Sequence, residues 1–245
     1  MVVLFALKEI SNNNPYAIIK YNHLEDKLSA SGNILVFRVN YQGLIPAGQA
    51  KLENKGEELY QDKKVYHLSV KIYPFDFCSK IFNAQVQADS YIDTAKLHTL
   101  KFKQCLILPN KPKDEKEVLY DQDKNFMQLK GVRRQILPDT QDPLSAIFYI
   151  QRQNLEIGKE FDVNINTNQK NYQFYAKVIG REEYTLEARK IGVWVLEAII
   201  RRRDKNPYHK TTMKLWLLDN PSKIPILIKA MSGIGQVTAR LTSVD

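Results

Sequence analysis

The sequence has few of the residues that build metal sites, disulfides and redox centres. It holds two cysteines, Cys78 and Cys105, and four histidines among 245 residues. The histidines are scattered without ligand spacing and the cysteines form no C-x-x-C pair, so we expect no metal site and no cofactor. If residues 81–92 and 98–108 pair as a hairpin, the two cysteines lie too far apart for a disulfide. We therefore expect two free thiols.

Long hydrophobic runs are also missing. No apolar stretch approaches the roughly 18 residues that a membrane-spanning helix needs, so we expect no transmembrane segment. The opening MVVLFAL carries no basic leader and runs into Lys8 and Glu9, so as it stands it is too short for a secretory signal. Two alternatives stay open: a cytosolic protein, or an exported protein whose signal is not part of this sequence.

The composition is that of a globular protein, with 44% hydrophobic and 26% charged residues. A chain of this length can bury a core that needs neither metal nor disulfide. The formal net charge is +9, which favours anionic partners such as nucleic acid, acidic lipid headgroups or an acidic polymer. Charge alone does not choose among them.

Alternation of apolar and polar residues is the dominant pattern. In NILVFRVNY, Leu35, Phe37 and Val39 share one face, while Arg38 and Asn40 fall on the other. This period of two is typical of a strand with a buried face. It recurs, with turn residues between, at 65–73, 82–93, 97–108, 116–121, 125–130, 161–167, 172–180, 193–203, 210–219, 224–231 and 235–243.

About twelve strands joined by short links predict an all-β protein. The simplest arrangement is an antiparallel meander, and a twisted sheet of this size curls into a barrel or half-barrel. We expect residues 1–31 to be an irregular lead-in and residues 32–245 to form a single curled-sheet domain. The segment DPLSAIFYIQRQNL breaks the alternation. Asp142 is a plausible N-cap and Pro143 suits the first helical position, which predicts one short helix over residues 143–155.

The stretch YQGLIPAGQAKL contains two glycines with the spacing of a phosphate-binding loop. Such a loop needs Lys and Ser or Thr directly after the second glycine, followed by a helix. Here Gln49 and Ala50 follow Gly48, and an alternating strand pattern begins. We interpret the stretch as a turn in a β-chain, with Gly43 at a positive-φ position and Pro46 at a strand start.

No constellation of catalytic residues converges. The sequence has no G-x-S-x-G elbow, and a dyad of either cysteine with His98 lacks an orienting third group. Glu182 and Glu183 are neighbours on a strand and point to opposite faces, so they cannot act on one substrate. We therefore assign no catalytic residue and expect a protein that is not an enzyme.

The strongest polar feature is the basic run RRRDKNPYHK. Arg201, Arg202, Arg203 and Lys205 are either a solvated turn between two strands or a cationic rim that contacts anionic groups. A nucleic-acid surface would need exposed aromatic residues interleaved on a sheet face. The sequence has no such pattern, so nucleic acid is not the favoured partner.

Two strand segments, VWVLEAII and LWLL, are apolar on both faces. Either the sheet packs on both faces, covered by the helix or the N-terminal segment, or the interior stays partly open and holds a lipid-like ligand. We interpret the tryptophans of these two segments first as core residues. If the interior is open, the candidate ligand-binding residues are Trp194, Trp216, Phe148, Tyr149 and Leu217.

Four stretches together resemble a known family: GNILVFRVNYQGLIPAGQAKL, SYID, DPLSAIFYIQ and LWLLDNPSKIPILIKAMSGIGQVTARL. In this order they resemble the bacterial exported proteins of domain-of-unknown-function family 3108. The resemblance implies a YmcC-like fold, similar in outline to the Lol-type carriers of lipoproteins, and a location in the periplasm or cell envelope. It carries over no catalytic residue. SYID and DPLS are interpreted as fold signatures, a strand end and a helix start.

Two functions remain in view. The leading hypothesis is a non-enzymatic envelope protein that binds an apolar or amphipathic ligand within its curled sheet. The alternative is an interaction or assembly module that has a packed interior and binds another envelope protein or an acidic polymer through its basic rim or its sheet edges.

Overall fold

Fourteen strands form one antiparallel sheet in the part of the chain that the structure describes. The computed structural model describes residues 32–75, 84–186, 189–204, 210–233 and 235–245. The sheet order is β8-β7-β6-β5-β4-β3-β2-β1-β14-β13-β12-β11-β10-β9. The first strand therefore lies in the middle of the sheet, and the chain runs out to one edge and returns from the other.

The strands of the half that begins the chain are β1 (Ile34–Tyr41), β2 (Ile45–Tyr60), β3 (Lys63–Pro74), β4 (Gln85–Asp93), β5 (Thr99–Ile107), β6 (Asp114–Asp121), β7 (Phe126–Leu129) and β8 (Val132–Gln135). The other half consists of β9 (Glu160–Thr167), β10 (Lys170–Leu186), β11 (Arg189–Arg202), β12 (Lys210–Leu218), β13 (Pro225–Ser232) and β14 (Gly235–Val244). The helix α3 (Ser145–Gln151) connects the two halves.

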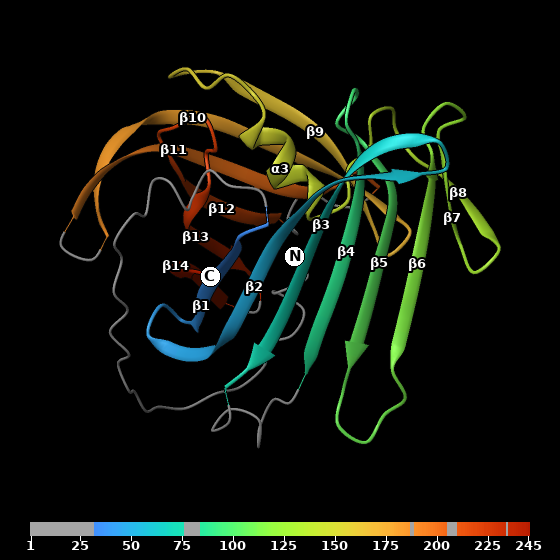
Figure 1. Cartoon of the computed structure of the whole chain (residues 1–245), viewed down its shortest axis with the longest axis horizontal. Coiled ribbons are helices and arrows are strands. Elements are labelled where there is room, and N and C mark those ends of the chain that lie inside the picture. Colours follow the sequence, from blue (N-terminus) through green and yellow to red (C-terminus); the bar gives the residue numbers. More distant parts are fainter. Residues whose placement is uncertain (1–31, 76–83, 187–188, 205–209, 234) are drawn as a thin grey trace.

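The sheet curls until its two edges approach each other, but it does not close (Figure 1). The segment between β8 and α3 spans the gap. Gln141 forms a parallel bridge with Ile165 of β9, and the Asn171 side chain donates a hydrogen bond to the backbone oxygen of Gln135. The predicted all-β, curled antiparallel meander is confirmed as a half-barrel.

The predicted strand count was too low. The twelve counted segments do not include β2, which was expected only as the strand that follows the turn at Gly43, or β8, which was missed. The pattern of β2 is disturbed by Pro46, Gly48 and a bulge between Asn54 and Glu57. The four residues of β8 are all exposed and show no alternation. Alternation reports a half-buried strand, so a fully exposed edge strand does not produce the signal.

The helix is shorter than the predicted 143–155. The Asp142 carboxylate accepts hydrogen bonds from the backbone N–H groups of Leu144 and Ser145, which fixes a turn before the helix begins. Leu144, not Asp142, is the N-cap residue. At the other end, the Arg152 N–H is shared between two carbonyl oxygens, 3.2 Å from each, a tightening typical of a helix terminus.

The structure describes one of the two cysteines. Cys105 is a free cysteine and lies opposite Gln87 in the pairing of β4 with β5. Cys78 and the lead-in 1–31 lie outside the described residues. The division into lead-in and single domain stays a prediction.

The two glycines of YQGLIPAGQAKL serve the chain's path, as predicted. Gly43 has φ +77° and lies in the turn between β1 and β2. Gly48 lies within β2, next to a bulge in the pairing with β1 and opposite Pro74 of β3. A Cβ atom on Gly48 would stand 2.2 Å from the carbonyl oxygen of Tyr73. The second glycine is therefore required by the close approach of two backbones.

This geometry predicts the cost of filling that contact. Replacing Gly48 with Ala forces β2 and β3 apart and should lower the free energy of unfolding by about 2–3 kcal/mol, the cost of overpacking. Gly180 is the matched control, because it lies at a bulge in β10 with open space around its missing Cβ. Urea unfolding of both variants checks this. Equal stability of Gly48→Ala and Gly180→Ala would contradict it.

Candidate functional site

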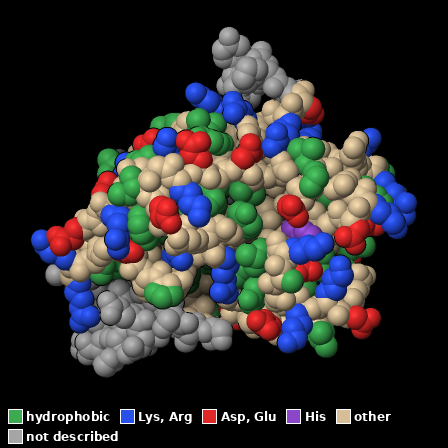
Figure 2. Space-filling model, turned by 90° about the horizontal axis from the view of Figure 1, so that it is seen from above, with side chains coloured by type: hydrophobic (Ala, Val, Ile, Leu, Met, Phe, Trp, Pro, Cys, Tyr) green, Lys and Arg blue, Asp and Glu red, His purple; other side chains and the backbone are tan. Residues whose placement is uncertain are grey.

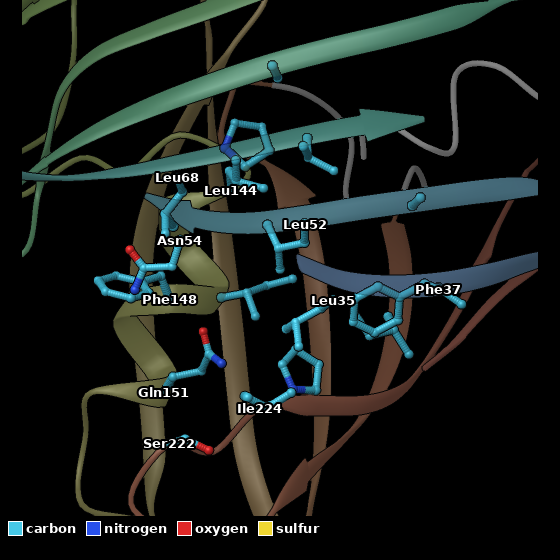
Figure 3. Close-up of a pocket in the computed structure, with 18 of the residues that line it drawn as sticks. Leu35, Phe37, Leu52, Asn54, Leu68, Leu144, Phe148, Gln151, Ser222 and Ile224 are labelled. Atoms are coloured by element: carbon cyan, nitrogen blue, oxygen red, sulfur yellow. The ribbon is translucent and has the colours of Figure 1, made fainter. Parts of the chain in front are cut away.

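A cavity of about 360 Å³ lies between the concave face of the sheet and α3. Figure 3 shows Leu35, Phe37, Leu52 and Leu68 reaching into it from the strands. Leu144, Phe148 and Gln151 face them from the helical segment, and Ser222 and Ile224 complete the wall from the β12–β13 connection. Its volume lies at the lower end of the range for small-molecule sites, and its lining is mostly apolar.

Strand alternation builds the sheet side of this cavity. One row of cross-strand neighbours runs over β1 to β4 and consists of Leu35, Leu52, Val70 and Ala88. A second row on the same face consists of Phe37, Ala50 and Ile72. All seven side chains line the cavity. Because every second residue of a strand points to one face, the pattern in the sequence becomes an apolar wall.

The helical side of the cavity is held by a buried polar network around Asp142. Its carboxylate accepts hydrogen bonds from the Ser90 hydroxyl and from the Thr99 hydroxyl, the latter at 2.9 Å. It also accepts from the backbone N–H of Leu144 at 2.7 Å and that of Ser145 at 3.1 Å. Ser90, Thr99 and Asp142 are fully buried. The network therefore ties β4 and β5 to the start of α3.

Two opposing effects act on this carboxylate. Burial raises the pKa of Asp142 above its ordinary value, because an ionised group loses its water there. The hydrogen bonds from Ser90, the two backbone amides and Thr99 act in the other direction, and burial outweighs them. A carboxylate with so many donors is costly to remove, since each donor would be left unpaired in the interior.

Polar side chains collect where α3 ends. Asn33, Asn54, Gln151, Arg152 and Ser222 all line the cavity. The Gln151 amide donates to the backbone oxygen of Lys223 at 3.1 Å, and the Ser222 hydroxyl donates to the Asn220 side chain at 2.6 Å. The cavity therefore combines apolar walls with polar groups near one end.

Of the five predicted ligand-binding residues, the structure places Phe148 in the cavity lining. Trp194, Trp216, Tyr149 and Leu217 do not line it. The Trp216 ring is buried and its indole N–H donates to the Glu182 carboxylate at 3.2 Å. The Arg181 guanidinium lies over the Trp194 ring, 4.5 Å from its centroid. The two tryptophans belong to the packed part of the sheet, and a ligand role for the four residues remains only a prediction.

The basic run is engaged in local contacts. The Arg201 side chain donates to Gln173 at 2.7 Å, and the Arg203 guanidinium donates to Asn164 at 2.6 Å. Arg202 forms an ion pair with Asp204, while Lys205 lies outside the described residues. On the face of the molecule seen in Figure 2, basic and acidic side chains are interspersed. The described arginines therefore contact neighbours within the chain, and contact with an anionic partner remains a prediction.

The sequence-based choice of site residues missed most of the cavity wall. Leu35 and Phe37 were correctly placed on one buried face, but they were not named as site residues. Small residues, and not the tryptophans, would have indicated the cavity: Ala50, Ala88 and Ala239 lie on inner faces and line the space. Aromatic residues fill an interior, and alanines leave it open.

A second titratable cluster lies on the outer face of β2, β3 and β4. The buried ring of His67 is hydrogen-bonded to Glu58 at 3.1 Å and to Asp89 at 3.0 Å, and it stacks on Tyr91. Burial alone would raise the pKa of Asp89, but hydrogen bonds, chiefly from His67, and the charge of Lys55 outweigh it and hold this pKa well below its usual range.

The described residues contain no cluster of three or more His, Cys, Asp or Glu side chains that could hold a metal ion. Their helices include none with the length and apolar character needed to cross a membrane.

The comparisons with known proteins place the chain among proteins without an assigned activity. Residues 36–242 match the family described as protein of unknown function (DUF3108), as the sequence resemblance predicted. No curated protein matches the chain.

Among solved structures, the chain is similar to a β-barrel-like protein of domain of unknown function DUF1849 from Brucella abortus. That match has a TM-score of 0.59 and 11% identity, and it covers 88% of this chain and 97% of the other. A Bacteroides fragilis protein with a YmcC-like fold gives a TM-score of 0.41 at 7% identity, over 88% and 96% of the two chains. The hypothetical lipoprotein YmcC from Escherichia coli gives 0.37 at 12%, over 89% and 88%. The Brucella match shows a shared fold, and the two lower scores add nothing to that.

The Asp142 network makes a prediction about stability. Replacing Asp142 with Ala leaves two backbone amides and two hydroxyls without their acceptor, and should lower the free energy of unfolding by about 3–4 kcal/mol. Asp123→Ala is the control, because Asp123 is exposed and pairs only weakly with Lys96 at 3.9 Å. It should cost no more than about 0.5 kcal/mol. Chemical unfolding measures both, and an equally small loss for the two variants would show that the network does not hold the fold.

The two perturbed carboxylates predict opposite effects of pH. The pKa of Asp142 is raised in the folded state, so its contribution to stability falls as pH rises above the unfolded value of about 3.9. The pKa of Asp89 is lowered, so its contribution is present above about pH 4 and is lost as pH falls below it.

Unfolding free energies of the wild type, Asp142→Asn and Asp89→Asn, measured between about pH 3 and pH 7, test these signs. The wild-type advantage over Asp142→Asn should shrink with rising pH above about 4. The advantage over Asp89→Asn should grow up to about pH 4 and then stay constant. If the unfolding free energies of the two variants depend on pH in the same way, the opposite directions assigned to the two pKa shifts are wrong.

Proposed function

We propose that this chain, which belongs to the DUF3108 family of proteins of unknown function, binds an amphipathic, lipid-like molecule in the cavity beneath α3 without catalysing a reaction on it. The observation that carries the proposal is the cavity of about 360 Å³ with its two apolar rows on one wall and Phe148 on the other. Taking about 30 Å³ for a group of methylene size, it has room for a chain on the order of ten carbons.

The apolar lining is sufficient to hold such a chain. Burying one methylene group contributes about 0.8 kcal/mol, so ten contribute on the order of 8 kcal/mol before the costs of association are subtracted. These costs consume a large share, which leaves a moderate affinity of the kind that permits release. A carrier needs both uptake and release, so the cavity binds its ligand reversibly in this proposal.

The chemistry of the lining supports binding over catalysis. The described residues that line the cavity include no His, Cys, Asp, Glu, Lys or Tyr. General acid–base or nucleophilic catalysis would need such a group within hydrogen-bonding distance of the bound molecule. A site of apolar residues, amides, one arginine and the Ser222 hydroxyl, which donates to Asn220, can hold a molecule and orient it.

The alternative function, an assembly module, has less support. It relies on the basic rim or on the sheet edges, and in the rim Arg201, Arg202 and Arg203 each have a partner within the chain. These contacts within the chain would have to be broken before the arginines could bind a partner, which reduces the net free energy of binding. A location in the periplasm or cell envelope, implied by the resemblance to the family, is part of the leading proposal.

A cavity-filling variant tests the proposed binding. Ala239 lines the cavity from β14, so Ala239→Phe should occupy the space and weaken binding of a dansyl-labelled fatty acid at least about tenfold, or 1.4 kcal/mol. Arg240→Phe is the matched control. It is the next residue of the same strand, its side chain points to the other face, and it is exposed.

Fluorescence titration and native mass spectrometry of the gently purified protein give the readouts, with circular dichroism as the check of folding. The control should bind as the wild type does. If the folded wild type carries no lipid and takes up no probe, the proposed function is wrong. If the two variants weaken binding equally, the probe binds elsewhere.

A further inference from the structure

The cavity has a single charged side chain in its lining. Among the described residues that line it, Arg152 alone carries a charge. It directly follows the last residue of α3, and it is exposed to solvent. A cation at the edge of an apolar space can contact both the space and the water outside, so it distinguishes one end of the cavity from the other.

The arginine is held in place by aromatic rings and not by an acid. Its guanidinium lies 4.9 Å from the ring centroid of Tyr66 and 4.8 Å from that of Phe148. These two rings are themselves in edge contact. No described carboxylate lies within ion-pair distance of Arg152, in contrast to Arg202 at the end of β11 and Arg203 directly after it. Its donors are oriented by stacking and remain available to a ligand.

The labelled polar residues of the lining gather on one side of the cavity, where Leu144 and Phe148 of the helical segment also lie (Figure 3). Figure 3 shows Asn54, Gln151 and Ser222 on the side of the cavity where α3 lies. Leu35, Leu52 and Phe37 extend away from that side along the strands. A molecule that matches this arrangement has one polar end beside α3 and one apolar end along the sheet.

We propose that the ligand is a single-chain anionic amphiphile whose acidic head group pairs with Arg152 while its chain lies along the rows of β1 to β4. The guanidinium fork matches a carboxylate or a phosphate, each of which can accept two parallel hydrogen bonds. The amides of Asn54 and Gln151 lie at the same end. The volume of about 360 Å³ suits one chain.

This inference rests on the proposed function, and the test separates the two. Three probes share one chain and differ in the head group: dodecanoate, dodecyl phosphate and the neutral glycerol monoester of dodecanoic acid. Isothermal titration of the intact protein with each probe compares the wild type with Arg152→Gln and Arg152→Lys. Arg133→Gln is the matched control, because Arg133 also stacks on a ring, that of Phe126 at 4.6 Å, but does not line the cavity.

The wild type should bind both anions more tightly than the neutral ester. Arg152→Gln should lose about tenfold in affinity for the anions, since the charge-assisted hydrogen bonds to the head group are lost, and should bind the ester unchanged. Arg152→Lys should retain most of the preference, and Arg133→Gln all of it. Whichever of dodecanoate and dodecyl phosphate binds more tightly shows whether the head group is a carboxylate or a phosphate, and either result supports the proposal.

The outcomes that overturn the inference are distinct from those that overturn the proposed function. If the ester binds as tightly as the anions, or if Arg152→Gln binds the anions as the wild type does, the head-group inference is wrong and the apolar cavity still binds a chain. If none of the three probes binds to the folded wild type, the proposed function falls, and this inference falls with it.

Discussion

The fold depends on one carboxylate inside the sheet. Asp142 enters the interior on the segment that follows β8 and meets Ser90 of β4 and Thr99 of β5, while its backbone neighbours begin α3. An ionised group in such a place is unfavourable unless its hydrogen bonds are complete. Four donors complete them, two from β4 and β5 and two from the backbone at the start of the helical segment. The placement of α3 over the concave face, and with it one wall of the cavity, follows from this network.

The second constraint is volume. A curled sheet of this size encloses more space than a single layer of side chains fills, so the interior must be packed by large residues or left hollow. Phe161, Phe174 and Met127 are buried in the core and do not line the cavity. Beneath α3 the inner positions include Ala50 and Ala88, which do. These short side chains leave part of the space between the sheet and α3 unfilled.

The sequence predicted the architecture well because alternation is a local signal. It assigned the inner face of β1 and β3 correctly, and it identified the turn at Gly43. It missed β8, which has no buried face, and it placed the N-cap of the helix at Asp142 instead of Leu144. Fold signatures could be recognised in SYID and DPLS, but not that Ser90 of one donates to Asp142 of the other. That contact joins residues 52 positions apart, and only the curl of the sheet brings them together.

The site was harder to predict than the fold, for a related reason. Sequence patterns show how many charges a segment carries, and the run from Arg201 to Arg203 is therefore conspicuous. The structure shows which charges already have partners, and those arginines do. Arg152 stands in an ordinary polar stretch, QRQN, and nothing local marks it. Its aromatic support comes from Phe148 one turn earlier and from Tyr66 of β3, far away in the sequence. An available cation beside an apolar cavity is thus a property of the curled sheet, and it exists only once β3 and α3 face each other.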